Sequence, residues 1–80
     1  MKISITMPAL RPEMKSGILC AWLKNPGDPV KKGEPLFEIE TEKVVNQVEA
    51  EQDGVLCETC IEEGDEAEVG KQIGTMEVGA

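Results

Sequence analysis

The chain repeats itself at a distance of 37 residues, and this repeat constrains its possible folds more than any other feature. Residues 17–40 align without a gap on residues 54–77, with seven identities in twenty-four pairs. The identical pairs are Gly17/Gly54, Leu19/Leu56, Cys20/Cys57, Gly27/Gly64, Asp28/Asp65, Gly33/Gly70 and Glu40/Glu77. Because glycine accepts positive φ angles and the close approach of another chain, the repeated glycines predict turns or close contacts at the same points in both halves.

Each half has the pattern of short strands separated by turns. Residues 3–7 and 36–40 alternate apolar and polar side chains, residues 17–23 are almost continuously apolar, and residues 44–50 form a further candidate strand. The prolines within residues 25–29 fix φ and lack an N–H donor, so no helix can cross this segment, and residues 62–65 take the same role in the second half. We therefore expect an all-β domain of about eight strands in two sheets related by a pseudo-twofold axis.

The length of the chain predicts one domain, residues 1–80, with its core at about residues 3–77. Apolar residues make up 40% of the chain, but Trp22 and Phe37 are its only aromatic residues. The core should therefore consist of small aliphatic side chains between two layers, which leaves little room for a large substrate pocket.

The formal net charge of -8, from 16 acidic and 8 basic residues, argues against nucleic acid and anionic membranes as partners. The longest apolar run, Ile18 to Leu23, is much shorter than the roughly 18 residues of a membrane span. The amino terminus also lacks the layout of a signal peptide. We expect a soluble intracellular protein, cytoplasmic or, in a eukaryote, in the mitochondrial matrix.

Three cysteines cannot form a complete disulfide framework, so a reducing compartment is expected. Cys57 and Cys60 have CxxC spacing, but there is no second CxxC and no histidine to complete a zinc site. Strand residues three apart also point to opposite faces. We interpret the cysteines as packing residues and expect no metal site, an interpretation that thiol titration or a zinc assay would test.

Lys43 follows a candidate strand at the point where the repeat runs out. The 37-residue offset aligns Glu40 to Lys43 with the last four residues of the chain, so the pseudo-twofold axis should place Lys43 and the carboxyl terminus at opposite ends. Residues 41–44 should form a tight hairpin with Glu42 and Lys43 at the tip. Neither is glycine or asparagine, so we expect a type I turn. Taken alone, Lys43 is one of seven lysines, and a solubilising turn residue is the ordinary interpretation.

The residues around Lys43 favour a more specific interpretation. The chain resembles, from about residue 3 to residue 77, the lipoyl domain of the acyltransferase component of 2-oxo acid dehydrogenase complexes. The resemblance rests on the order and spacing of these segments: Met7-Pro8-Ala9-Leu10, Met14, Gly17-Ile18-Leu19, Trp22-Leu23-Lys24, Gly27-Asp28-Pro29-Val30, Gly33, Leu36, Glu40-Thr41-Glu42-Lys43, Val48-Glu49-Ala50, Gly54-Val55-Leu56, Glu63-Gly64, Val69-Gly70 and Ile73.

This resemblance implies a flattened barrel, or barrel-sandwich hybrid, of two four-stranded antiparallel sheets. It implies that Lys43 is joined to lipoic acid through an amide, and that Thr41, Glu42 and Val44 contribute to recognition around the attachment turn. A lipoate ligase or a lipoyl/octanoyl transferase would install the group. Modification would remove the charge of Lys43 and change the formal net charge from -8 to -9.

The resemblance also implies a non-catalytic carrier role within a larger dihydrolipoyllysine-residue acyltransferase. A thiamine-dependent 2-oxo acid or acetoin dehydrogenase would reductively acylate the lipoyl group. An acyltransferase core would receive the acyl group, and dihydrolipoamide dehydrogenase would reoxidise the dithiol. The loop from Pro8 to Ser16 would identify the domain to the dehydrogenase.

Four positions depart from the family pattern. The tip is Glu42-Lys43-Val44 where the family usually has Asp-Lys-Ala, and Ser16 stands where glutamate is frequent. Asn46 falls on the strand face of Val44 and Val48, where an apolar residue is usual. We expect Asn46 either to find backbone partners or to be turned outward by a bulge, since a buried unpaired amide costs about 1–3 kcal/mol.

Three alternative functions can be compared with these residues: acid/base catalysis, biotin attachment and an unmodified scaffold. Glu40 and Glu42 could be mistaken for an acid/base pair, but an exposed turn in a chain without histidine favours solvated or recognition roles. A biotin carrier domain shares the architecture, although it typically flanks its lysine with methionines. An unmodified barrel-sandwich adaptor is the second alternative, although such proteins usually insert a helical hairpin where the Lys43 turn lies.

Overall fold

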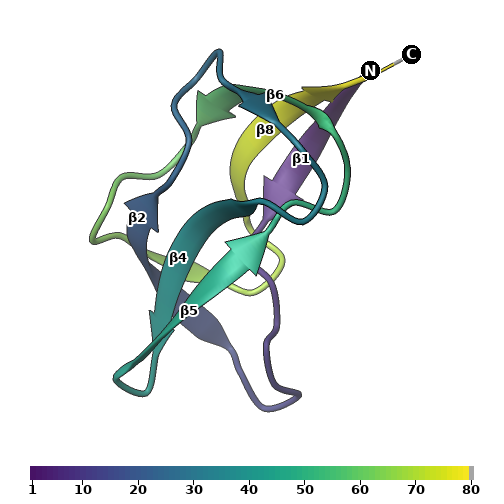
Figure 1. Ribbon diagram of the computed structural model, residues 1–80. Helices are drawn as coiled ribbons and strands as arrows, with labels where there is room; N and C mark the ends of the chain where they lie inside the picture. The colour runs from purple at the N-terminus through teal and green to yellow at the C-terminus, as the bar shows by residue number, and fades with distance from the viewer. Residues whose placement is uncertain (80) are drawn as a thin grey trace.

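The computed structural model describes residues 1–79, which form eight strands and no helix. The strands are β1 (Lys2–Thr6), β2 (Ser16–Trp22), β3 (Pro29–Val30), β4 (Pro35–Thr41), β5 (Val44–Glu49), β6 (Gly54–Thr59), β7 (Glu66–Glu68) and β8 (Gln72–Val78). They make two four-stranded sheets, in the orders β1-β8-β6-β3 and β5-β4-β2-β7, with every neighbouring pair antiparallel (Figure 1). The all-β prediction is confirmed. Within these residues no helix is long and apolar enough to cross a membrane.

The internal repeat is reproduced in the sheet topology. Strands β2, β3 and β4 correspond to β6, β7 and β8, and each sheet has the same order once β5 is equated with β1. Even the irregularities repeat, because the register of β2 on β4 shifts between Leu19 and Ala21, and that of β6 on β8 shifts between Leu56 and Glu58. The predicted pseudo-twofold relation is confirmed.

Reciprocal hydrogen bonds join the two halves at the repeated Gly-Asp pairs. The Gly27 N–H donates to the carbonyl of Leu56 at 2.7 Å, and the Gly64 N–H donates to the carbonyl of Leu19 at 2.7 Å. Gly27 and Gly64 have φ values of 96° and 98°, which favour glycine. In the first turn the Asp28 carboxylate also accepts the backbone N–H of Asn25 at 2.8 Å. Each half therefore completes the backbone hydrogen bonding of the other.

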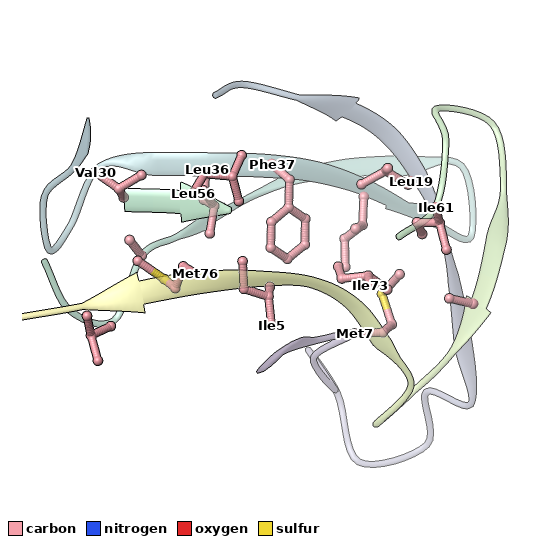
Figure 2. Close-up of a cluster of buried hydrophobic side chains, with 14 of the residues drawn as sticks. Ile5, Met7, Leu19, Val30, Leu36, Phe37, Leu56, Ile61, Ile73 and Met76 are labelled. Atoms are coloured by element: carbon pink, nitrogen blue, oxygen red, sulfur yellow. The ribbon is translucent and has the colours of Figure 1, made fainter. Parts of the chain in front are cut away.

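The core lies between the two sheets, as Figure 2 shows, and is built mainly from aliphatic and methionine side chains. Phe37 is 1% exposed and packs against Trp22, with ring centroids 5.3 Å apart. The indole N–H of Trp22 donates to the carbonyl of Ile61 at 3.1 Å. Thr75 is also buried, and its hydroxyl has no hydrogen-bond partner among residues 1–79. Thr75 pairs with exposed Ser4 in the sheet, so this unsatisfied hydroxyl lies on the outer face of β8 and not in the core.

The turn between β3 and β4 is organised by Glu34. Its carboxylate accepts the backbone N–H of Lys31 at 2.7 Å and the Lys24 ammonium at 3.3 Å. These contacts lower the pKa of Glu34 below its ordinary value. The hydrogen bond from the Lys31 backbone has the larger effect, and the hydrogen bond from Lys24 the smaller. The ionised form is therefore favoured in the folded protein.

Candidate attachment site

The Lys43 hairpin joins β4 to β5 through a two-residue loop. Thr41 pairs with Val44, and the two residues between them, Glu42 and Lys43, have φ values of 49° and 66°. Two positive φ values define a type I′ turn, so the expected type I turn is wrong. The reason is that the twist of type I′ matches the right-handed twist of the strands, which here prevails over a cost of roughly 1–2 kcal/mol for each non-glycine residue.

The hairpin between β4 and β5, which carries Lys43, lies at one end of the molecule, and the start of β1 and the end of β8 lie at the other (Figure 1). Lys43 is exposed, and among residues 1–79 it forms no ion pair. The next two residues, Val44 and Val45, are 57% and 54% exposed. The predicted separation of Lys43 from the carboxyl end is confirmed, and the amine is accessible to another protein.

Arg11, in the loop between β1 and β2, forms hydrogen bonds with the tip of this hairpin. Its Nη1 donates to the Glu42 carboxylate at 3.0 Å, and its Nη2 to the Thr41 hydroxyl at 3.5 Å. Its Nε lies 3.8 Å from the carboxylate of Glu13 in the same loop. This contact is not predicted from the sequence, although Arg11 is the only arginine in the chain and stands in the loop expected beside the turn.

Packing beneath the hairpin also holds this loop. Met14 is 9% exposed, and its sulfur accepts the backbone N–H of Leu10 at 3.3 Å. A Cβ at Gly17 would lie 3.0 Å from Met14 Cε and 3.6 Å from Thr41 Cγ2, so the methionine fills the space that Gly17 leaves under the hairpin. The loop of residues 8–16 is therefore held against the Lys43 turn at Met14.

A shallow hollow of about 350 Å³ separates the loop from the hairpin. Glu40, Thr41 and Glu42 line one wall, and Ser16, at the other, donates from its hydroxyl to Glu66 at 2.8 Å. A second hollow of about 270 Å³ opens between β1 and β5. Glu40 and Glu42 thus line an open hollow on the surface beside the Lys43 turn.

The three cysteines lie outside the Lys43 turn. Cys57 is half-buried in β6, and Cys60 follows that strand and is exposed. Cys20 is half-buried in β2, where burial, followed by the nearby charges of Glu40 and Glu38, raises the pKa of its thiol. Among residues 1–79 no group of three or more cysteine or carboxylate side chains could hold a metal ion.

Asn46 matches neither of the two expectations for it: within residues 1–79 its side chain has no backbone partner, and no bulge turns it outward. It pairs with the buried Ile39, so its side chain faces inward, and the register of β5 on β4 is regular at this point. Asn46 is nevertheless only half-buried, because β5 is an edge strand. Water can therefore solvate its amide, and the expected backbone partner or bulge is not needed.

Fold and site together define a small β-sandwich attachment domain, with two duplicated halves and one exposed lysine on a tight hairpin. The family model described as "Biotin-requiring enzyme", the biotin/lipoyl family, matches residues 3–76. The chain therefore belongs to the biotin/lipoyl attachment family.

Curated relatives are components of large enzyme complexes. The chain is 45% identical over 76 residues to the dihydrolipoyllysine-residue succinyltransferase component of the 2-oxoglutarate dehydrogenase complex of Bacillus subtilis, covering 95% of this chain and 18% of that protein. It is 49% identical over 61 residues to the dihydrolipoyllysine-residue acetyltransferase component of the pyruvate dehydrogenase complex of Rickettsia typhi, covering 76% of this chain and 15% of that protein. The chain thus spans less than a fifth of each relative.

Solved structures agree with the fold. The lipoyl domain of the 2-oxoglutarate dehydrogenase complex of Azotobacter vinelandii superposes with a TM-score of 0.79 at 38% identity, covering 98% of this chain and 99% of that one. A multi-domain long-chain acyl-CoA carboxylase superposes with a TM-score of 0.81 at 11% identity, over 99% of this chain and 7% of that one, which supports the fold alone.

Proposed function

We propose that this chain is a lipoyl carrier domain and that lipoate is attached to Lys43 through an amide at Nζ. The observation that carries the proposal is an exposed lysine, without an ion pair among residues 1–79, on a type I′ turn at the end remote from the chain ends. A primary amine in this position fits a carboxylic acid cofactor, because amide formation needs only an accessible nitrogen. When bound, lipoate supplies a disulfide for acyl transfer and thiol–disulfide exchange.

The chain's own residues present that group and identify it. The two-residue loop fixes the direction in which Lys43 leaves the sheet, and Thr41, Glu42 and Val44 form the immediate surface for recognition. The loop of residues 8–16, joined to the turn through Arg11 and Met14, supplies further identity. A group displayed in this way stays at high effective concentration near successive active sites when the domain is tethered.

The relatives support a place in a 2-oxo acid dehydrogenase complex, whose parent acyltransferase would contain residues 1–80 as one domain. Its partners would be a lipoate ligase or lipoyl/octanoyl transferase, a thiamine-dependent dehydrogenase, the acyltransferase core and dihydrolipoamide dehydrogenase. The cytoplasm, or the mitochondrial matrix in a eukaryote, would be its compartment. Biotin is the competing cofactor, since the family includes both, but the neighbours of Lys43 are Glu42 and Val44 instead of methionines.

The test is to incubate the chain separately with a lipoate ligase and with a biotin ligase, each with its cofactor and ATP, and to measure intact mass. We expect one lipoyl group per chain, no biotin, and complete loss of modification in Lys43→Ala. Lys71→Ala, at an exposed position near the start of β8, is the matched control and should be modified like the wild type. Biotinylation of the wild type, or lipoylation that persists in Lys43→Ala, would contradict the proposal.

A further inference from the structure

The guanidinium of Arg11 forms an ion pair with the carboxylate of Glu42, the residue that precedes Lys43. Glu42 and Lys43 are adjacent on the two-residue loop, yet the Glu42 carboxylate is 3.0 Å from Arg11 Nη1 and is not paired with Lys43. We propose that Arg11 is a positioning residue for lipoylation: it holds the Glu42 carboxylate and so leaves the Lys43 amine unpaired for the modifying enzyme. This inference rests on the proposed function and names a residue that sets its efficiency.

A backbone hydrogen bond within the loop restrains Arg11. Its carbonyl accepts the N–H of Met14 at 3.1 Å, and Met14 is buried beneath the hairpin. From this position the planar guanidinium reaches two side chains at once, Glu42 through Nη1 and Thr41 through Nη2. A planar fork is suited to such a contact, whereas the lysine ammonium is a single point of charge.

Loss of Arg11 would change which cation the Glu42 carboxylate meets. Within the turn of residues 41–44, Lys43 is the only other basic residue. Glu42 is already held at positive φ beside it, so a released carboxylate has the Lys43 ammonium as its neighbour. Such a pair would be exposed and weak, which limits the expected effect on rate to about two- to fivefold.

The pairing matters because the amine must react as a free nucleophile. In transfer from a lipoyl adenylate, Lys43 Nζ forms a bond to the carboxyl carbon, the bond from that carbon to the phosphate oxygen of AMP breaks, and the nitrogen releases a proton. An ammonium paired with Glu42 must first give up that contact and then lose its proton. Arg11 removes this competition by engaging the carboxylate in advance.

The experiment measures initial rates of lipoylation by a lipoate ligase with ATP and lipoate, using intact mass. We expect Arg11→Gln to be about two- to fivefold slower than the wild type, within the range for an exposed ion pair. Arg11→Lys should recover most of the rate because it restores a cation near Glu42. In a Glu42→Gln background, Arg11→Gln should have no further effect. Lys24→Gln removes the ion pair with Glu34 away from the hairpin and should react like the wild type.

Two results would overturn the inference and leave the proposed function intact: an Arg11→Gln rate equal to that of the wild type, or an equal slowing by Arg11→Gln with and without Glu42→Gln. The second result would mean that Arg11 contacts the ligase directly. A urea unfolding curve checks that each variant is folded, and Arg11→Lys decides the question if Arg11→Gln is not. A wild-type chain that is never lipoylated would instead overturn the proposed function, and this inference with it.

Discussion

Replacing Gly54 by alanine should destabilise the fold much more than the same change at its repeat counterpart, Gly17. A Cβ at Gly54 would collide with the backbone carbonyl oxygen of Glu77 in the neighbouring strand β8 and would lie 2.9 Å from Met76 Cε. The nearest atoms to a Cβ at Gly17 would all belong to side chains: Met14 Cε at 3.0 Å, Met7 Sδ at 3.3 Å and Thr41 Cγ2 at 3.6 Å. The repeat therefore provides a matched pair in which one collision involves backbone and the other does not.

The loss of unfolding free energy depends on whether the atoms that the new Cβ meets can move away. Overpacking usually costs about 1–3 kcal/mol, and a backbone carbonyl in a central strand cannot escape through a rotamer change, so we expect Gly54→Ala to lose about 3 kcal/mol. At Gly17 the thioether can rotate, and the lower entropy of an unfolded alanine returns about 0.4–1 kcal/mol, so the net loss should be below about 1 kcal/mol. An 80-residue domain has a total stability of roughly 4–12 kcal/mol. The Gly54 variant should lose a large part of it.

Urea unfolding followed by Trp22 fluorescence measures this difference, since Trp22 packs on the core residue Phe37. With a slope of about 1 kcal/mol per molar urea, the midpoint should fall by about 3 M for Gly54→Ala and by less than about 1 M for Gly17→Ala. Equal midpoints for the two variants, with unchanged slopes, would refute the argument that backbone crowding at Gly54 is what requires glycine.

Three further outcomes are expected. Thr75→Val should raise the free energy of unfolding by about 1 kcal/mol in the same urea assay, because it replaces a buried unpaired hydroxyl with a methyl group; a lower value would contradict this. Glu34→Gln should lower the urea midpoint at pH 7. Because folding lowers the pKa of Glu34, that loss should shrink as the pH falls below the ordinary value of 4.5, and a loss that stays constant to pH 2 would contradict the assignment. A thiol-alkylating reagent at pH 8, followed by peptide mass analysis, should label exposed Cys60 before Cys20, whose pKa is raised by burial and by two glutamates.

The sequence predicts most of the fold because the repeat records backbone requirements. Gly27 and Gly64 mark turns with positive φ, and Gly17 and Gly54 mark close approaches, so one alignment at an offset of 37 residues places the turns and long strands of both halves. Strands β3 and β7, with two and three residues, carry no periodic signal and are visible only in the paired structure. The alternation of residues 3–7 also continues to Met7, one residue beyond the observed end of β1.

The conformation of the Lys43 turn could not be predicted from local sequence. Glu42 and Lys43 are not the asparagine, aspartate or glycine that favour a type I′ turn. Their conformation is therefore set by the pairing of Thr41 with Val44 and by the twist of the two strands. The contact of Arg11 with Glu42 joins residues 31 positions apart, and it depends on how Met14 packs beneath the hairpin. Neither feature is encoded in a local pattern.

Strands β4 and β8 are equivalent in the repeat, but only β4 continues into a hairpin. The first half ends in a hairpin that carries Lys43, whereas the matching strand of the second half ends at Val78, one residue before the last described residue. The molecule is 37 Å along its longest axis and only 22 and 19 Å across, with the hairpin and both chain ends at opposite extremes in Figure 1. An enzyme could thus enclose the entire lysine-bearing tip, from all sides, without touching the backbone near either chain end.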